Sequence, residues 1–321
     1  MIKRYVGIDL GGTNLKLGLV TPDCRMIERL STATEAARGP DHVLGRMADA
    51  VRDLAELAGT GLSEIAAVGC ACPGPLDTKA GVVVFAPNMP GWNNIHARDI
   101  LQKSLGRPVV LENDANVAAY GEYRCGAARK ARSLVVLTLG TGIGGGLILD
   151  GRIFRGVNDT GAEFGHIVIV HGGRKCGCGN RGCLEAYASA TAVVKRFAEA
   201  LAAGESSTLA GEEDFSSKDI FEAAAAGDAL SRRIVDETAD YLASGITSLL
   251  HVVNPDMAVL TGGMMAAGDA WLDRIRGRVR EMALEPASAA CEIRWSSLGG
   301  DAGILGAALA AEAFERTGQP A

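Results

Sequence analysis

The chain has 321 residues, of which 48% are hydrophobic, so it is long enough for about two domains that each bury a core. Its 32 basic and 38 acidic residues give a formal net charge of −6 without any lysine or arginine run, which disfavours a nucleic-acid partner. The apolar run in the opening MIKRYVGIDL is too short for a signal peptide, and no segment approaches the ~18 uncharged apolar residues of a membrane span. We therefore expect a cytoplasmic protein without nucleic-acid or membrane partners.

The first half of the chain predicts strands and helices that follow an opening hairpin. Strand patterns occur at residues 5–9, 15–20, 65–72 and 109–112, and helical patterns occur at 41–58 and 118–123. Prolines follow the third of these strands, and they prevent a helix from continuing there. The fourth strand runs into Asn113, Asp114 and Asn116, and these residues could simply be helix N-caps.

The second half of the chain repeats the opening arrangement. A strand at 134–139 enters the glycine run 140–146, and another strand follows at 147–150. Two halves that each begin with strand, glycine turn and strand indicate a duplicated fold with a nucleotide between the copies. Further helices are expected at 184–203, up to about 251, after Met264 and at 304–314, with a polar loop at 204–217 and a strand at 257–261.

Three cysteines and a histidine have the composition of a closed zinc site. Cys176, Cys178 and Cys183 follow His166 closely, and a Cys₃His set suits tetrahedral structural zinc. The glycines between the cysteines let the backbone turn tightly. The alternative is a set of reduced thiols in a glycine-rich loop, and His171 competes with His166 as the fourth ligand. The other cysteines are scattered, and in a reducing cytosol we expect no disulfide.

Both glycine turns carry groups that suit phosphate. Residues 140–145 match the G-x-G-x-x-G pattern of dinucleotide-binding proteins, but a strand follows where that motif needs a helix, and neither glycine run ends as a P-loop does. Backbone amides of such turns can cradle phosphate oxygens, and an aspartate can hold Mg²⁺. The alternative is a pair of ordinary hairpin turns. The candidate residues for phosphate and Mg²⁺ are Asp9, Gly11, Gly12, Thr13, Thr138, Gly140, Thr141 and Gly142.

Motifs spread over nearly the whole chain resemble those of the ROK family of sugar kinases and sugar-responsive repressors. They are residues 9–13, 113–116, 139–146 and 163–166 and the cysteine run 176–183, in the family's order and spacing. The resemblance implies an α/β fold of the duplicated actin-like ATPase (ribonuclease H-like) type, with two lobes and a cleft between them. We expect a small lobe at 1–112, completed by a C-terminal helix at 304–321, and a large lobe at 113–303 that carries the zinc loop.

The resemblance also implies roles for particular residues. Asp114 corresponds to the catalytic base of the kinases, which takes the proton of a sugar hydroxyl during phosphoryl transfer. His166 would ligate zinc through one ring nitrogen and bind a sugar hydroxyl through the other. Gly262 and Gly263 match the adenosine-side turn, although they could simply precede a helix. The implied sugar-binding residues are Gly74, Asn88, Asn113, Asp114, Glu163, His166 and Glu185, and the implied zinc ligands are His166, Cys176, Cys178 and Cys183.

We therefore expect an ATP-dependent hexose kinase that uses Mg²⁺, contains structural Zn²⁺ and converts glucose to glucose 6-phosphate. Kinases for N-acetylmannosamine, fructose or mannose stay open, as does polyphosphate as donor, because the same polar residues suit the hydroxyls of many hexoses. A repressor of the family is the alternative from another class. Such regulators carry a winged helix-turn-helix before the sugar-binding fold, whereas the first strand pattern here begins at Tyr5. We also expect a homo-oligomer, either a dimer or a tetramer.

Overall fold

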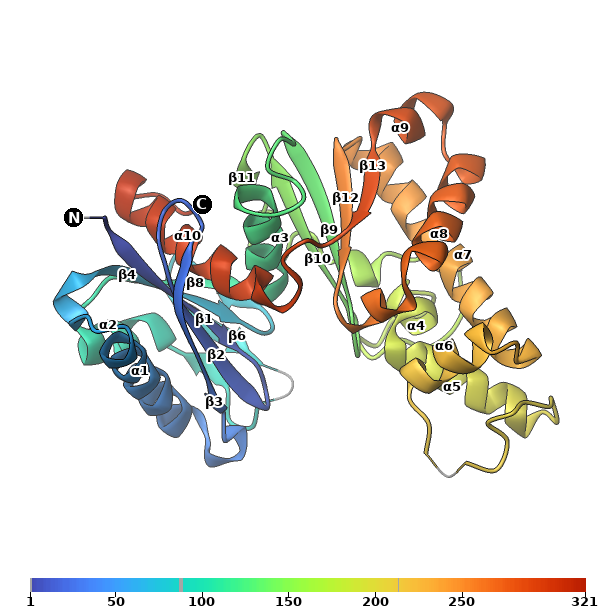
Figure 1. Ribbon diagram of the computed structural model, residues 1–321, viewed down its shortest axis with the longest axis horizontal. Coiled ribbons are helices and arrows are strands. Elements are labelled where there is room, and N and C mark those ends of the chain that lie inside the picture. Colours follow the sequence, from blue (N-terminus) through green and yellow to red (C-terminus); the bar gives the residue numbers. More distant parts are fainter. Residues whose placement is uncertain (1, 87–88, 213) are drawn as a thin grey trace. The chain divides into compact units, whose positions relative to one another are not determined.

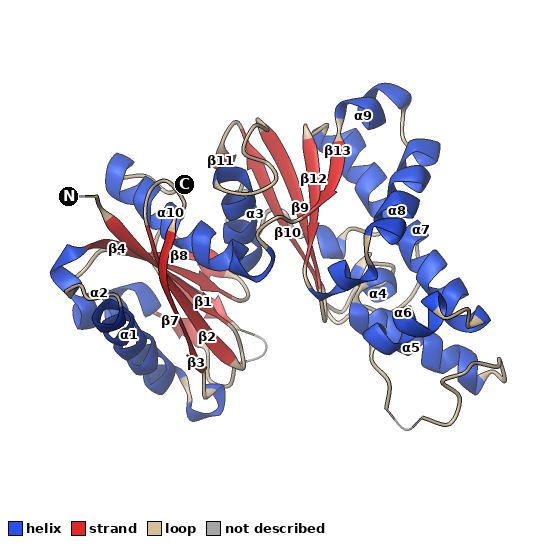
Figure 2. Cartoon of the chain, in the orientation of Figure 1, coloured by secondary structure: helices blue, strands red, loops and turns tan. Residues whose placement is uncertain are grey.

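The computed structural model describes residues 2–86, 89–212 and 214–321, which form two compact units (Figures 1 and 2). The first unit contains the chain up to Arg132 together with Gly146–Ala162 and Ser297–Ala321, and the second contains Ser133–Gly145 and Glu163–Ser296. The expected lobes, 1–112 with 304–321 and 113–303, stay a prediction. Asn88, an expected sugar-binding residue, lies outside the described residues.

The first unit is built on a sheet with the strand order β3-β2-β1-β4-β8. Its strands are β1 (Arg4–Leu10), β2 (Asn14–Val20), β3 (Met26–Ala33), β4 (Ile65–Cys72) and β8 (Val109–Asn113). The pairs β1–β2 and β2–β3 are antiparallel, whereas β1–β4 and β4–β8 are parallel. A small antiparallel sheet in the same unit contains β5 (Leu76–Asp77), β6 (Val82–Phe85) and β7 (Asn93–Ile95).

The other large sheet has the same plan, with the strand order β11-β10-β9-β12-β13. Its strands are β9 (Ser133–Leu139), β10 (Ile143–Leu149), β11 (Arg152–Ile153), β12 (Met257–Thr261) and β13 (Glu292–Trp295). The pair β10–β11 is antiparallel, whereas β9–β12 and β12–β13 are parallel. The duplication that the sequence predicts is therefore confirmed strand by strand. The strand expected at 147–150 begins earlier, because part of the glycine run belongs to β10.

Helices cover both faces of the first sheet (Figure 1). Side chains alternate along β1, so Val6 and Ile8 pack in one core with α1 (Pro40–Leu57) and α2 (Ala97–Leu105). Tyr5, on the opposite face, packs with residues of α10 (Ala302–Thr317). Helix α3 (Asp114–Arg124) packs against α10. The sequence patterns indicated neither α2 nor β3.

The second unit is rich in helices. They are α4 (Glu185–Ala188), α5 (Ala190–Ala202), α6 (Ser217–Ala225), α7 (Ala229–Val253), α8 (Asp269–Met282) and α9 (Glu285–Ala290). The prediction of one helix over 184–203 is wrong, because Ser189 adopts an extended conformation and its side chain caps α5 by accepting from Ala192 N. Short 3-10 helices over the described chain are η1 (Ala36–Arg38), η2 (Leu62–Glu64), η3 (Phe164–His166), η4 (Gly263–Ala267) and η5 (Gly299–Asp301). None of the described helices combines the length and apolarity needed to cross a membrane.

A disulfide joins Cys24 to Cys125 in the first unit, so the prediction that the chain has none is wrong. Cys24 lies in the turn between β2 and β3, and Cys125 is the C-cap residue of α3. Their Cα atoms are 5.7 Å apart although 101 residues separate them in the sequence. Only the packing of α3 beside the sheet brings the two thiols together, which is why their spacing carried no signal.

Helix α10 lies with its backbone directly against the backbone of the sheet. An ideal Cβ on Gly7 of β1 would lie 1.9 Å from the carbonyl oxygen of Ile304, and one on Gly69 of β4 would lie 1.9 Å from that of Ala307. On the helix itself, a Cβ on Gly306 would lie 1.7 Å from the carbonyl oxygen of Val117 in α3. Glycine is therefore required where β1, β4, α3 and α10 meet.

We predict that Gly69→Ala lowers the free energy of unfolding by about 1–3 kcal/mol or more, because the added methyl group overlaps backbone that cannot move independently. Gly45→Ala is the matched control. Gly45 lies inside α1 with no atom within 4 Å of an added Cβ, so alanine there should stabilise the protein by about 0.5–1 kcal/mol. Denaturant titrations of both variants test this, and a Gly69→Ala protein as stable as the wild type would contradict it.

Candidate functional site

The turn between β1 and β2 carries Gly11, Gly12 and Thr13. Thr34, which is fully buried, donates two hydrogen bonds to the backbone of this turn. Its hydroxyl donates to the carbonyl oxygen of Gly11 at 2.6 Å, and its N–H donates to that of Thr13 at 2.8 Å. Gly12 and Thr13 are exposed. The turn thus has a fixed backbone and an open outer side, as a phosphate-binding turn requires.

Asp9 lies on the face of β1 that α10 covers. An ideal Cβ on Gly303 would be 3.4 Å from the Cγ of Asp9. Burial raises the pKa of the Asp9 carboxyl above its ordinary value of 3.8, and the nearby charge of Lys16 offsets part of that rise. A half-buried carboxylate whose charged form is disfavoured is poised to gain from a cation placed beside it.

Asp9 and Asn113 occupy the same edge of the first sheet. In the parallel register, Asp9 pairs with Ala71 of β4 and the next β4 residue, Cys72, pairs with Asn113 of β8. Burial raises the pKa of Cys72 well above its usual range, and the charges of Asp114, Asp9 and Glu112 add to that rise. Carboxylates therefore gather at the carboxyl ends of these strands, where open α/β sheets bind ligands.

The Asn113-Asp114 pair forms the start of α3. Asn113 is the N-cap residue, since its Oδ1 accepts from Ala115 N at 2.9 Å and from Asn116 N at 3.2 Å. Its Nδ2 donates to the carbonyl oxygen of Gly74 at 3.5 Å, so these two expected sugar-binding residues are brought together. Asp114 is exposed, and its Oδ1 accepts from Ala115 N at 2.8 Å. The N-cap alternative thus applies to Asn113, whereas Asp114 presents its carboxylate at the helix start.

The turn between β9 and β10, residues 140–142, is the counterpart in the second unit. Thr191 of α5 donates its hydroxyl to the carbonyl oxygen of Thr141 at 2.8 Å. Thr138 does not point away from the turn but holds it, because its hydroxyl accepts from Gly144 N at 3.0 Å. The side chain of Thr141 is exposed. Of the two threonines, Thr141 is therefore the one available to a ligand.

Gly262 lies directly beside the end of β9. Its φ of 103° is one that side-chain-bearing residues rarely adopt, and an ideal Cβ would lie 2.4 Å from the carbonyl oxygen of Leu139. Gly263 begins the 3-10 helix η4. The glycine pair thus lets the chain after β12 approach the second glycine turn. The pair also leads into a short helix, which is the alternative interpretation that the sequence offered.

The four expected zinc ligands gather into one cluster in the second unit. One donor atom from each of His166, Cys176, Cys178 and Cys183 lies within 4.8 Å of the others. The Nδ1 of His166 is 3.7 Å from the Sγ of Cys176, and the Sγ atoms of Cys178 and Cys183 are also 3.7 Å apart. His171 is not part of this group. Three thiols and an imidazole at this separation fit the donor set of structural zinc.

The thiols of the cluster differ in their environments. Burial raises the pKa of Cys176 to about 12 and also raises the pKa of Cys183, whereas a hydrogen bond from the backbone of Asn180 lowers the pKa of the exposed Cys178. Thiols that are protonated at neutral pH release their protons when they bind a metal. Metal binding here is therefore expected to weaken as the pH falls.

Glu185 connects this cluster to the second glycine turn. Its Oε2 accepts from Ile143 N at 3.0 Å, and Cys176 Sγ lies 3.5 Å from its Oε1. An ideal Cβ on Gly142 would be 2.4 Å from the same Oε2, and one on Gly165 would be 2.0 Å from the carbonyl oxygen of Ile143. Glu185, an expected sugar-binding residue, and the segment that contains Gly165 thus pack against the second glycine turn and the start of β10. A cavity of about 380 Å³ beside them is lined by residues that include Thr141, Gly142, Lys175, Glu185 and Lys195.

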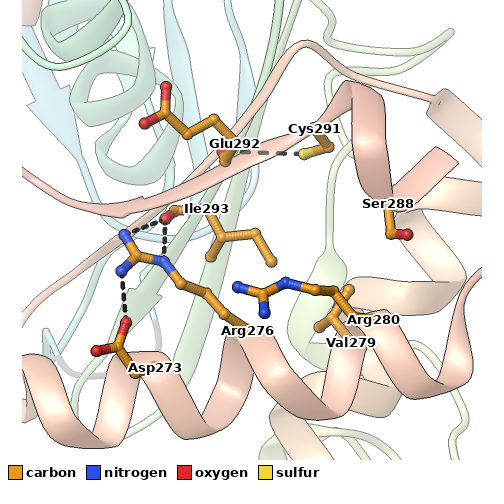
Figure 3. A pocket seen from close by; sticks show the side chains of 8 residues that line it. All are labelled: Asp273, Arg276, Val279, Arg280, Ser288, Cys291, Glu292 and Ile293. Atoms are coloured by element: carbon orange, nitrogen blue, oxygen red, sulfur yellow. Dashed lines mark hydrogen bonds and ion pairs between the residues drawn. The ribbon is translucent and has the colours of Figure 1, made fainter. Parts of the chain in front are cut away.

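A second cavity in this unit, of about 350 Å³, contains none of the expected site residues (Figure 3). Arg276 donates to the carbonyl oxygen of Ile293 and to Asp273, so its guanidinium braces α8 against β13.

The sequence analysis did not identify Glu112 and Arg155, which form a buried ion pair in the first unit. A buried acid next to the Asn113-Asp114 motif is a signal that a cation must lie nearby, although it does not say which one.

Comparisons with known proteins agree over nearly the whole chain. The sequence pattern that defines the ROK family matches residues 5–313. A glucokinase from Thermotoga maritima is 38% identical over 309 residues, which cover 95% of this chain and 96% of that protein. The structure of a ROK hexokinase from Thermus thermophilus matches with a TM-score of 0.85 at 35% identity, covering 98% and 99% of the two chains. That of a ROK family glucokinase from Streptomyces griseus, in complex with glucose and AMPPNP, matches with a TM-score of 0.80 at 34% identity, covering 97% and 99%.

We predict that Asp9→Asn stabilises the protein at neutral pH. Because the folded chain binds the Asp9 proton more tightly than the unfolded chain does, ionised Asp9 opposes folding once the pH exceeds its ordinary value of 3.8. The gain in melting temperature should grow as the pH rises from about 4 through the raised pKa. It should be smallest near pH ~4, because both states become protonated as the pH falls below the ordinary value.

Asp23→Asn is the control of opposite sign. A hydrogen bond from the Thr21 side chain lowers the pKa of the exposed Asp23, so its ionised form supports the fold at neutral pH and its replacement should lower the melting temperature. Thermal melts of both variants between pH 4 and 8 test the pair. An Asp9→Asn protein that melts below the wild type at pH 7 would be inconsistent with the environment described.

Proposed function

The chain belongs to the ROK family, and from this premise we propose that it transfers the terminal phosphoryl group of ATP to the 6-hydroxyl of glucose. Its fold is the duplicated actin-like ATPase fold expected from the sequence. The two glucokinase relatives support glucose as the acceptor, and the AMPPNP in one of them supports ATP as the donor. The cytoplasmic location and the homo-oligomeric state stay predictions.

The observation that carries the proposal is the placement of Asp114. A sugar hydroxyl is a weak nucleophile, and a carboxylate within hydrogen-bond reach can take its proton as the phosphoryl group moves, which contributes about 10²–10⁴-fold to the rate. Asp114 is exposed at the start of α3, and the hydrogen bond from Ala115 N fixes the direction of its carboxylate. Asn113 and Gly74, which contact one another, suit adjacent sugar hydroxyls. We assign Glu163, His166 and Glu185 to further hydroxyls.

We assign ATP to the two glycine turns. Amides of residues 11–13 and 140–142, with the exposed hydroxyls of Thr13 and Thr141, suit phosphate oxygens. Gly262 and Gly263 lack side chains where adenosine would approach. Asp9, whose charge is disfavoured by burial, suits Mg²⁺, which when bound would neutralise charge on the phosphates.

We assign structural zinc to His166, Cys176, Cys178 and Cys183. When bound, the ion would cross-link the loop that carries these residues. Because His166 directs Nδ1 toward Cys176, the opposite ring nitrogen, Nε2, is the one suited to a sugar hydroxyl. Glu185, which contacts the Cys176 thiol, belongs to the same braced segment.

ADP release measured over a panel of hexoses and N-acetylhexosamines tests the function. We expect glucose to give the highest kcat/KM and Asp114→Asn to lower kcat at least about 10²-fold, because the base is lost while the shape of the side chain is kept. Binding of glucose and of ATP should change little. A wild type that prefers another hexose would reassign the substrate, and near-normal turnover by Asp114→Asn would remove Asp114 from the base role.

Metal analysis of protein purified without added zinc tests the metal site. We expect one zinc ion per chain in the wild type and clearly less in Cys178→Ser, with the glucose KM raised much more than the ATP KM, because two sugar contacts depend on the braced loop. Cys291→Ser is the matched control, since Cys291 is a buried free thiol of the same unit outside the cluster. If Cys178→Ser kept full zinc and full glucose affinity, the ligand set would be wrong.

A further inference from the structure

The amino-terminal turn of α3 rests on a buried carboxylate. Glu112, the residue before the Asn113-Asp114 pair, is 2% exposed. Its Oε1 accepts from Asn113 N and from Asn116 Nδ2, each at 3.0 Å. Its Oε2 accepts from Arg155 Nε at 2.7 Å. Both oxygens of Glu112 are therefore used, one by the helix start and one by a cation 43 residues away in sequence.

Arg155 reaches Glu112 from a loop that is itself anchored. The loop follows β11, and it closes through a hydrogen bond from Gly161 N to the carbonyl oxygen of Arg155 at 2.8 Å. Asp159 of the same loop accepts from the N–H of Thr78 at 2.8 Å and from its hydroxyl at 3.0 Å. The side chain of Arg155 is 15% exposed. Its guanidinium therefore has little freedom to leave Glu112.

These contacts form a closed ring around the helix start. Glu112 binds the amide of Asn113, Asn113 reaches the carbonyl of Gly74, and the segment after Gly74 leads to Thr78, which binds the loop that carries Arg155. Every member lies in the first unit. Carboxylates at this edge would repel one another if uncompensated, and Arg155 supplies the buried positive charge among them.

We propose that Arg155 is a positioning residue for phosphoryl transfer, which acts by holding Glu112 and, through the amino-terminal turn of α3, the carboxylate of Asp114. The inference rests on the proposed kinase function. Without Arg155, Glu112 would be a buried charge with no cation, so it would take up a proton or admit water. Its hydrogen bonds to Asn113 and Asn116 would weaken, and a shift of about 1 Å in a reacting group can cost about 10²-fold in rate.

The test compares steady-state kinetics of Arg155→Met and Arg155→Lys with the wild type. We expect Arg155→Met to lower kcat between about 10- and 100-fold, with the ATP KM within about twofold, because none of the ATP-binding turns takes part in the ring. Arg155→Lys should give an intermediate kcat, since an ammonium keeps the charge but not the planar fork, and it serves if the methionine variant does not fold.

Arg124→Met is the matched control. Arg124 pairs with Glu312 at 3.2 Å, with side chains 24% and 9% exposed, at the opposite end of α3. This change removes a comparable ion pair from the same helix and should leave kcat within about twofold of the wild type. A kcat loss as large as that of Arg155→Met would overturn the proposal, because general loosening of α3 would then explain both.

The double variant Glu112→Met/Arg155→Met separates positioning from stability. It leaves no unpaired buried charge, so its melting temperature should recover relative to Arg155→Met. Its kcat should stay low, because methionine offers no acceptor to Asn113 N and Asn116 Nδ2 and the anchor of the helix start is missing. Recovery of kcat together with the melting temperature would overturn the proposal, as would a folded Arg155→Met or Arg155→Lys protein with wild-type kcat.

A wild type that phosphorylates no sugar would overturn the proposed function and this inference with it. An active wild type with unaffected Arg155 variants would overturn the inference alone.

Discussion

Direct contact between the backbone of α10 and the backbones of β1, β4 and α3 is the constraint on which the first unit depends. Glycines at the points of closest approach remove the side chains that would otherwise hold these elements apart. Because Asp9 lies near the end of β1 and α3 begins with Asp114, the same packing sets where the first glycine turn and the proposed base lie along one sheet edge. These residues of the candidate site are thus positioned by closely packed helices and strands.

In the second unit, close backbone contacts also position residues of the candidate site. Gly165 lets the segment that carries Glu163 and His166 pass directly under β10, and Glu185 accepts from the amide that follows the glycine turn. The cysteine loop then reaches Glu185 through Cys176. Glu185, which binds sugar in our proposal, is therefore hydrogen-bonded to the residue that follows the turn to which we assign phosphate. This contact gives a physical basis for aligning acceptor and donor.

The fold and much of the candidate site could be predicted because their signals are local. A strand, a glycine turn and a second strand occur within a few residues of one another, and the donor set of the metal cluster lies within a short segment, so both are visible without knowledge of the fold. Ser189 also carried a local signal, since serine is a preferred N-cap residue. Its capping of α5 explains why the chain forms α4 and α5 in place of the one long helix that was predicted.

The remaining contacts depend on tertiary packing. Glu112 and Arg155 are 43 residues apart, and Cys24 and Cys125 are 101 apart, so no periodicity or spacing joins them. Strand β3 alternates between partly buried and exposed residues, a pattern with a weak apolar face that indicates an edge strand only once its neighbour is known. The expected lobes likewise follow the order of motifs along the chain, whereas the compact units follow packing, which returns residues 146–162 and 297–321 to the first unit.

The position of α10 in the chain has a consequence for protein synthesis. On the ribosome, the strands of the first sheet emerge before any of the second unit, whereas α10 emerges after all of it. Until then, Tyr5, Val20 and Ala67 on one face of that sheet lack the α10 residues that cover them. An early domain that waits for its last helix exposes apolar surface to chaperones and to other nascent chains throughout elongation. The second unit, which spans two segments made in between, can complete its own core first, so the order of folding need not follow the order of the sequence.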